Sequence, residues 1–213
     1  MGKRLQYTLV LGIIAMVTSV GVGATYVITK DKIARKEASR RMEALLTVLP
    51  GMEGAPVQLT PSDTKPEDNV YKGQGKDGST VGYAALGKAQ GYSSTLKVMV
   101  GLSSDMDKVL GIKVLYQAET PGLGTRIIEV PTTKTLWTMF FGDEKADATE
   151  EVSLTPWFCD QFIGKTLNQL EVVRQEDPSK IIAITGATIT TRAVVKAVQD
   201  AIAKIQNAAS SSS

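Results

Sequence analysis

The chain contains no histidine and a single cysteine, and these two shortages exclude several kinds of chemistry. Without histidine there is no Ser-His-Asp or Cys-His nucleophile pair, no histidine-ligated metal site and no imidazole general base. With Cys159 alone, an intramolecular disulfide, a cysteine-ligated zinc site and a self-contained iron–sulfur cluster are excluded. Cys159 lies in the apolar run Trp157-Phe158-Cys159, which favours a small core residue over a reactive thiol. We expect no metal site, and a protein of this composition that carries electrons needs an organic cofactor.

Charge is almost balanced, with 24 lysines and arginines against 22 aspartates and glutamates. The basic excess of a nucleic-acid-binding protein is therefore missing, and we expect no nucleic-acid partner. The length of 213 residues is enough for one membrane anchor and one domain of ordinary size.

Residues 7–28 carry no charged side chain. A helix of about 20 apolar residues crosses the hydrocarbon core of a bilayer, so we expect a transmembrane helix at 7–28, preceded by a short flank at 1–6. A signal peptide is the alternative, because a basic start followed by an apolar run fits both. The run is longer than a usual signal-peptide core, and no clear cleavage site with a polar mature start follows it. These features favour an uncleaved anchor.

The charges that flank this run bear on its orientation. Two basic residues precede it, Lys3 and Arg4, whereas six follow it: Lys30, Lys32, Arg35, Lys36, Arg40 and Arg41. Because positive charge accumulates on the cytoplasmic side of membrane helices, the count by itself favours a cytoplasmic position for the large domain.

The polar part of the chain begins with a helical pattern. Residues 29–50 are expected to form a juxtamembrane helix that continues from the membrane and stops at Pro50-Gly51. Residues 51–69 contain several prolines and polar residues, and we expect a loop there with room for one short strand.

From residue 70 onward the apolar residues change to a period of two, which is typical of strands. The alternation is clearest at 96–102 and 110–116, and residues 103–107 between them have the composition of a hairpin turn. Residues 80–85 and 70–72 are expected to be further strands.

The last third of the chain mixes helical and strand patterns. Short helices are expected at 133–141 and 160–167, around an acidic loop at 143–151, and short strands at 170–174 and 181–184. A final helix has an apolar stripe formed by Val194, Val198, Ala201, Ile202 and Ile205.

These elements predict an α+β fold, with a single N-terminal transmembrane helix followed by one domain. The domain is expected to span residues 70–207 and to hold an antiparallel sheet with helices packed on one face. Residues 208–213 are small and polar, and we expect a disordered tail.

Two glycine-containing strings stand out. The first, Thr185-Gly186-Ala187-Thr188, leads directly into the final helix. Gly186 permits a tight turn, Ala187 leaves the surface bare, and the N–H groups and dipole of a helix beginning near Thr190 favour a phosphate. A plain helix cap is the simpler interpretation of this string alone.

The second string, Glu119-Thr-Pro-Gly-Leu-Gly124, follows the strand predicted at 110–116. Pro121-Gly122 favours a tight turn with a positive φ angle at the glycine. The bare backbone would let a flat aromatic ring lie against it, with Leu123 as an apolar contact and Thr120 as a hydrogen-bonding partner. A strand-exit turn is the simpler interpretation of this string alone.

Three strings occur in a fixed order: Glu119-Thr-Pro-Gly-Leu-Gly124, then Phe162-Ile-Gly-Lys165, then Thr185-Gly-Ala-Thr-Ile-Thr190 leading into Arg192-Ala-Val-Val-Lys-Ala-Val198. Together they resemble the FMN-binding domain of respiratory electron-transfer complexes. The likeness is greatest to the family of G subunits of the Rnf complex, which is related to the C subunit of the sodium-pumping NADH:quinone reductase. It covers residues 71–205 as a domain, and the N-terminal anchor matches the family layout.

The resemblance implies a function, a cofactor and partners. A protein of this family is the electron-transfer subunit of a membrane-bound ion-translocating ferredoxin:NAD oxidoreductase, with the other subunits of the complex as partners and little activity alone. It bears FMN through a phosphoester at the last threonine of the string, here Thr188, and a separate flavin transferase makes that bond from FAD. Thr185, Gly186 and Ala187 would complete this end of the site. The glycine-rich loop lies beside the flavin ring, which points to Thr120, Gly122 and Leu123.

Two implications of the resemblance disagree with other features of the sequence. The domain of this family faces the extracytoplasmic (periplasmic) side, against the charge count, and we give the family priority because partner subunits can fix an orientation. The target pattern of the transferase usually has an aspartate three residues before the first Ser or Thr of the string. Ile182 stands at that position, which bears on the efficiency of flavin attachment.

Three alternatives stay open. The chain could be the C subunit of the sodium-pumping reductase, which is typically longer, or a free-standing membrane-anchored flavoprotein reductase. It could also be a non-catalytic assembly or ligand-binding module in which Thr188 only caps a helix. Lys165, Arg126 and Arg192 are further candidates for contacts with the phosphate or the flavin.

Overall fold

The chain begins with one long helix, α1 (Lys3–Val48), in a computed structural model that describes residues 2–61, 64–130, 155–175 and 177–211. Its apolar window has a mean hydropathy of 1.9 and no residue buried within the structure, so α1 is long and apolar enough to cross a membrane. The chain divides into two units, Met1–Met42 and Glu43–Ser213, and the last turns of α1 belong to the second. The helix expected at 29–50 is therefore the C-terminal part of α1.

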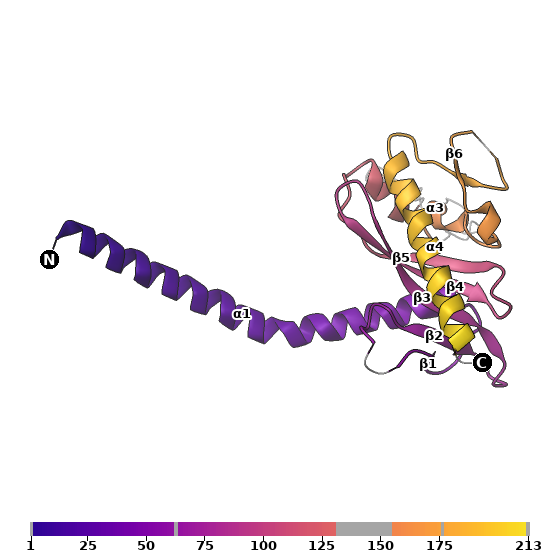
Figure 1. Cartoon of the computed structure of the whole chain (residues 1–213), viewed down its shortest axis with the longest axis horizontal. Coiled ribbons are helices and arrows are strands. Elements are labelled where there is room, and N and C mark those ends of the chain that lie inside the picture. The colour runs from indigo at the N-terminus through magenta and orange to yellow at the C-terminus, as the bar shows by residue number, and fades with distance from the viewer. Residues whose placement is uncertain (1, 62–63, 131–154, 176, 212–213) are drawn as a thin grey trace, which may run out of the picture. The chain divides into compact units, whose positions relative to one another are not determined.

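An antiparallel sheet forms the centre of the second unit (Figure 1). Its strands lie in the order of the sequence: β1 (Val57–Gln58), β2 (Val70–Gln74), β3 (Thr80–Gln90), β4 (Thr95–Ser103) and β5 (Val109–Tyr116). This confirms the predicted antiparallel sheet. The third strand is longer than the expected 80–85, because β3 pairs with β4 from Gly82, opposite Ser103, as far as Gln90, opposite Thr95.

One face of the sheet is covered by α4 (Thr188–Ser211), which lies across the strands in Figure 1. The stripe predicted for the final helix is buried in the core, together with sheet residues such as Ala85 and Leu96. Gly87 of β3 allows the close approach, because a Cβ atom there would lie 1.8 Å from the carbonyl oxygen of Ala197. The same glycine interrupts the apolar alternation, which explains why the periodicity does not reveal the second half of β3.

The opposite face is covered by the end of α1. Ala44, Leu45, Val48 and Leu49 are buried against Ala84, Leu86 and Met99. The expectation of helices on one face is therefore wrong: the apolar end of the juxtamembrane helix supplies the second layer.

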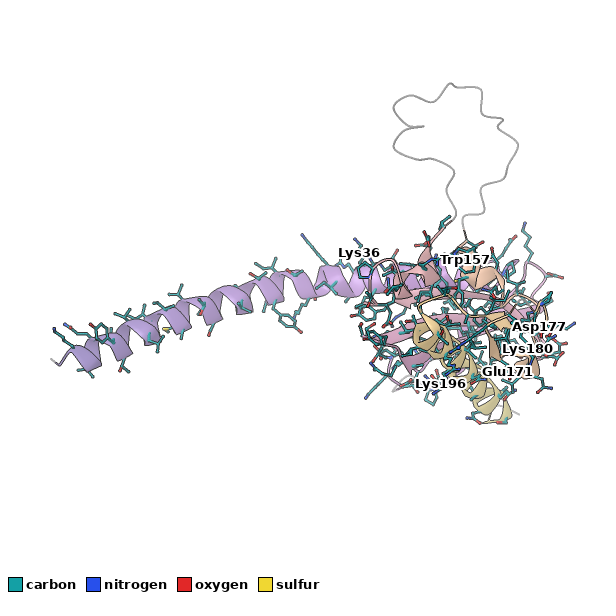
Figure 2. The ribbon with its side chains drawn as sticks, turned by 90° about the horizontal axis from the view of Figure 1, so that it is seen from above. Lys36, Trp157, Glu171, Asp177, Lys180 and Lys196 are labelled. Carbon is teal, nitrogen blue, oxygen red and sulfur yellow. The ribbon has the colours of Figure 1, made fainter. Side chains whose placement is uncertain are left out.

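The chain between the sheet and α4 contains short elements. They are the 3₁₀ helices η1 (Gly124–Ile128) and η2 (Leu167–Gln169), the helix α3 (Trp157–Asp160), and the parallel strands β6 (Val172–Val173) and β7 (Ile181–Ile182). Phe158 and Phe162 meet edge to face at 5.6 Å and are fully buried, which anchors this region. Glu171, Asp177 and Lys180 gather at one side of the domain (Figure 2), where Lys180 Nζ lies 2.6 Å from Glu171 Oε2.

Several details differ from expectation. A helix at 160–167 is wrong, because α3 ends at Asp160 and the chain turns at Gly164, whose φ is +76° and whose N–H donates to the Val109 carbonyl. A disordered tail at 208–213 is also wrong as far as Ser211, since α4 continues to that residue. Ala208 packs against the core, and alanine is the strongest helix former. The helix expected at 133–141 and the acidic loop at 143–151 lie outside the described residues.

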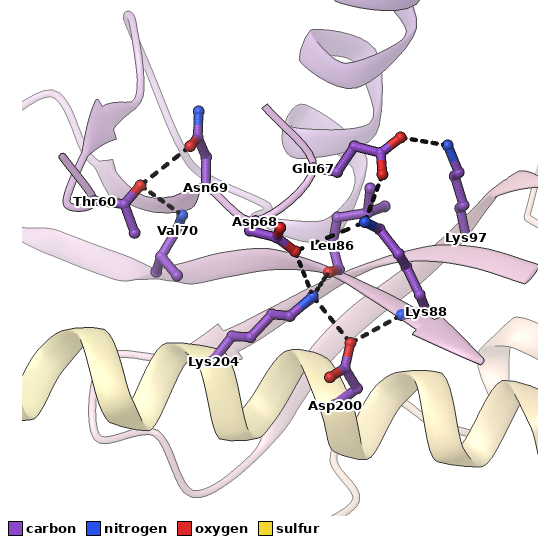
Figure 3. Close-up of polar contacts among 10 residues, drawn as sticks. All are labelled: Thr60, Glu67, Asp68, Asn69, Val70, Leu86, Lys88, Lys97, Asp200 and Lys204. Carbon is purple, nitrogen blue, oxygen red and sulfur yellow. Dashed lines mark hydrogen bonds and ion pairs between the residues drawn. The ribbon is translucent and has the colours of Figure 1, made fainter. Parts of the chain in front are cut away.

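A cluster of ion pairs fastens the segment before β2 to the sheet and to α4 (Figure 3). Lys88 and Lys97 both hold Glu67, and their hydrogen bonds lower the pKa of its carboxyl to about 2. Lys204 of α4 holds Asp68 at 3.1 Å and Asp200 at 3.0 Å. These groups are about one-third exposed, so each pair contributes less than about 1 kcal/mol, and the cluster serves mainly to fix the segment in place.

The packing of the end of α1 on the sheet gives the first prediction. A Cβ atom at Gly101 would lie 2.0 Å from the Val48 carbonyl oxygen, so Gly101→Ala must push the helix from the sheet. We expect a loss of about 1–3 kcal/mol in the free energy of unfolding, measured by denaturant titration of the full chain in detergent.

Gly111 is the matched control, because it pairs with Gly101 in the neighbouring strand. A Cβ atom there would meet Val48 Cα at 3.5 Å, an ordinary contact. Gly111→Ala should therefore cost much less, and equal losses for the two variants would contradict the proposed packing.

Candidate functional site

A cavity of about 490 Å³ lies between the loop after β5 and the first turn of α4. Three separate parts of the chain line it: the turn between β3 and β4, the glycine-rich loop after β5, and the string that opens α4. The lining residues are Tyr92, Glu119, Thr120, Leu123, Gly124, Gly186, Ala187, Thr188, Ile189 and Thr190.

The turn before α4 fixes where the helix begins. Gly186 has a φ of +81°, and the Ala187 N–H donates to the Ile184 carbonyl at 2.9 Å. The Thr191 hydroxyl donates to the Ala187 carbonyl at 3.1 Å and accepts from the Ile184 N–H at 3.2 Å. These bonds hold the N-terminus of α4 at the cavity, and the first N–H groups of a helix have no acceptor within it.

Glu119 joins the three parts of the site. Its side chain is 5% exposed, and its carboxylate accepts hydrogen bonds from the backbone N–H groups of Tyr92, Ser93 and Ser94 at 3.0–3.1 Å. The Ser94 hydroxyl donates to the same carboxylate at 3.1 Å, and the Thr190 hydroxyl donates at 2.6 Å. A single buried carboxylate thus connects the β3–β4 turn, the glycine-rich loop and the first turn of α4.

The charge of Glu119 is stabilised by these donors. Burial acts to raise the pKa of the carboxyl, but the Thr190 hydroxyl and the three backbone N–H groups outweigh it and hold the pKa below its ordinary value. Glycine is needed beside it, because a Cβ atom at Gly124 would lie 2.6 Å from Glu119 Cβ, and one at Gly91 would lie 2.6 Å from Glu119 Oε1.

The structure brings five of the seven predicted site residues to this cavity: Thr188, Gly186, Ala187, Thr120 and Leu123. Leu123 closes onto the helix string, since its Cδ2 lies 3.0 Å from where a Cβ of Gly186 would be. Thr185 and Gly122 do not line it. Gly122 instead shapes the loop, with a φ of +74° and an N–H that donates to the Thr125 hydroxyl at 3.0 Å.

The three basic candidates also lie outside the lining. Arg126 Nε is 3.3 Å from Glu129 Oε2, the Lys165 ammonium donates to the Pro178 carbonyl, and Arg192 is exposed on α4. Sequence reasoning missed Tyr92, Ile189 and the clamping role of Glu119. For Glu119 a signal existed, because the acid stands directly before a tight turn, but its partners at 92–94 are distant in sequence.

The threonine hydroxyls differ in availability. Thr190 donates to Glu119, and Thr191 donates to the Ala187 carbonyl. Thr188 is half-buried and lines the cavity, and its hydroxyl makes no hydrogen bond with any other residue that the structure describes. Of the hydroxyls on this turn of α4, that of Thr188 is the one open to a ligand.

Comparison with known proteins identifies the family. The family model of the FMN-binding domain matches residues 91–203, and that of the RnfG N-terminal region matches residues 4–48. The chain is 32% identical over 209 residues to the G subunit of the ion-translocating oxidoreductase complex of Aliivibrio fischeri, covering 92% of this chain and 87% of the relative. The chain belongs to this family of G subunits.

Two further proteins resemble the chain, one in sequence and one in fold. The chain is 30% identical to the G subunit of the Na⁺-translocating ferredoxin:NAD⁺ oxidoreductase complex of Acetobacterium woodii, over 93% of this chain and 90% of that one. Among solved structures, the C subunit of the Na⁺-translocating NADH-quinone reductase of Parabacteroides distasonis matches with a TM-score of 0.52 and 15% identity, covering 83% of this chain and 94% of that one. The latter likeness shows a shared fold.

The residues of the cavity fit FMN. The N-terminus of α4 favours a phosphate, and Thr188 offers a hydroxyl beside it. Around the cavity Tyr92, Leu123 and Ile189 are 69%, 45% and 56% exposed, and they offer apolar surface to a flat ring. We therefore take this cavity as the candidate FMN site.

The clamp at Glu119 gives the second prediction. Glu119→Gln replaces one acceptor oxygen by an NH₂ group, which faces donors that then lack a partner. We expect the free energy of unfolding to fall by about 1–3 kcal/mol, measured by denaturant titration at neutral pH.

Glu129→Gln is the control, because Glu129 is exposed and meets only Arg126 among the described residues. The difference between the two variants should shrink in acid. A carboxyl with a lowered pKa stabilises the fold above its unfolded-state pKa and loses that contribution as pH falls through its folded-state pKa. Equal stability of both variants at neutral pH would contradict the clamp.

Proposed function

We propose that this chain carries electrons on an FMN held in the cavity at the N-terminus of α4, as the G-type subunit of a membrane-bound ion-translocating ferredoxin:NAD oxidoreductase. The observation that carries the proposal is the meeting of the two glycine-containing strings at one cavity, within a chain of the G-subunit family. The A. woodii relative is named as such a subunit, and it aligns over 93% of this chain.

The FMN is attached through Thr188. In this step the hydroxyl oxygen of Thr188 forms a phosphoester with the FMN phosphate of FAD, the pyrophosphate bond breaks, and AMP leaves while the hydroxyl proton passes to solvent. A separate flavin transferase acts on the chain. The availability of the Thr188 hydroxyl supports this choice, since Thr190 and Thr191 donate their hydroxyl protons elsewhere.

Ile182, at the position of the usual aspartate, lies in β7 opposite Val173, and its N–H donates to Gln161 Oε1 at 2.8 Å. The substitution therefore changes a strand side chain that precedes the turn at Gly186. It leaves the turn itself and the Thr188 hydroxyl in place.

When bound, FMN supplies reversible oxidation and reduction at its ring. The chain contributes position and environment. The N-terminus of α4 would receive the phosphate, with Gly186 and Ala187 leaving room at that end, and Thr120 and Leu123 of the glycine-rich loop would lie against the ring. No histidine is present to move protons, so the residues of the site would act on the flavin by position and environment.

The membrane helix and the family indicate a membrane protein within a larger complex. We place the cavity-bearing domain on the extracytoplasmic side of the plasma or inner membrane. There a covalent bond prevents the loss of FMN by dilution. This orientation opposes the count of basic residues around residues 7–28, and we expect the other subunits of the complex to fix it.

Orientation is tested by adding a protease to cells whose outer membrane or cell wall has been permeabilised while the inner (plasma) membrane stays intact. We expect cleavage of the domain under conditions in which a cytoplasmic marker protein stays intact. Protection of the domain until the inner membrane is lysed would contradict the extracytoplasmic placement.

Attachment is tested by peptide mass spectrometry on chain isolated from native membranes. The peptide with Thr188 should carry the mass of FMN less one water, and Thr188→Val should abolish it. Thr95→Val is the control, because Thr95 is an exposed threonine of β4 outside both the string and the cavity lining, and its variant should retain the added mass. An unmodified Thr188 peptide would contradict the proposed attachment.

A further inference from the structure

The charge of the cavity is unusual for a phosphate site. Among the lining residues in the described part of the chain there is one carboxylate, Glu119, and no lysine or arginine. The basic candidates Arg126 and Lys165 lie outside the lining and contact Glu129 and the Pro178 carbonyl. A phosphate entering this cavity meets the positive end of a helix and, close by, a buried negative charge.

Glu119 weakens the attraction of that helix end for anions. Its Oε2 lies 2.6 Å from the hydroxyl of Thr190, in the first turn of α4, so a full negative charge lies beside the helix end whose dipole favours an anion. Four of its five hydrogen bonds come from donors of the β3–β4 turn, and the fifth comes from the Thr190 hydroxyl of α4. Burial keeps water from screening the charge, because the side chain is only 5% exposed.

The two chemical forms of the flavin phosphate differ in charge. Free FMN is a phosphomonoester with a second pKa near 6, so it carries about two negative charges at pH 8. FMN esterified to a threonine is a phosphodiester and carries one. The second charge of free FMN would face the charge of Glu119 with no lysine or arginine among the described lining residues to compensate it.

We infer that Glu119 is a specificity-determining residue that selects the singly charged flavin phosphodiester and rejects free, doubly charged FMN. The inference rests on the proposed function, since it concerns the same cavity and cofactor. It gives the chain a reason to depend on a covalent bond, because the site that accepts the attached flavin holds unattached FMN more weakly.

The test uses the full chain in detergent with Thr188→Val, which removes the attachment point. Three probes are titrated at pH 8 by flavin fluorescence: riboflavin, the monomethyl phosphodiester of FMN, and FMN, with charges of about zero, one and two. We expect FMN to bind about ten-fold more weakly than its monomethyl ester. Adding Glu119→Gln should reduce that ratio to less than about three-fold. The ratio is taken within each variant, so that a general loosening of the site, which riboflavin binding reports, affects both phosphate probes alike.

Ser94→Ala, also combined with Thr188→Val, separates charge from rigidity. It removes one donor to the same carboxylate and retains the charge, so the ratio should stay near ten-fold. A ratio that collapses equally in this control would overturn the inference, because the effect would then come from loosening of the site. Equal binding of FMN and its ester before Glu119 is changed, or no binding of any flavin by any variant, would also overturn it.

The mass of the Thr188 peptide from native membranes keeps the two proposals apart. A modified peptide together with no preference among the probes overturns the inference alone. An unmodified peptide contradicts the covalent attachment, and with it the premise on which the inference rests.

Discussion

The site depends on the hydrogen bonds that the buried carboxylate of Glu119 accepts. This carboxylate lies where three distant segments meet, and its hydrogen bonds satisfy backbone donors that a loop buried at this point would otherwise leave unpaired. Because the charge is fully hydrogen-bonded, it can be buried without neutralisation. The cavity therefore has its shape before any ligand arrives, and the glycines at 91 and 124 are needed to let the segments approach the carboxylate.

The sheet provides the rigid support behind this clamp. α4 covers one face and the end of α1 covers the other, each in contact with a glycine of the sheet, Gly87 or Gly101. Since α1 is one continuous helix through Val48, the same helix supplies both the apolar membrane segment and part of the domain core. Weaker packing of α1 on the sheet would therefore also loosen the sheet on which α4 packs, and with it the position of the N-terminus of α4.

Local patterns in the sequence were enough for much of this architecture. The alternation at 96–102 and 110–116 predicted β4 and β5, and the stripe from Val194 to Ile205 predicted the buried face of α4. The role of Leu45 and Val48 as a second core layer was not visible, because a helix does not reveal in its sequence which surface it will meet. The clamp was missed for a similar reason: the contacts of Glu119 with residues 92–94 join positions that no local period connects. The cofactor came from the resemblance, since composition required only that any redox group be organic.

The central claim is that the flavin attached at Thr188 exchanges electrons within the assembled complex. An anaerobic reductive titration of the complex purified from native membranes, followed by flavin absorbance, tests it most directly. The account predicts that reduction of the Thr188→Val complex causes a smaller loss of flavin absorbance than reduction of the unaltered complex. The difference should correspond to one flavin per complex, and the remaining redox centres should still be reduced. Identical bleaching in the two complexes would contradict the claim.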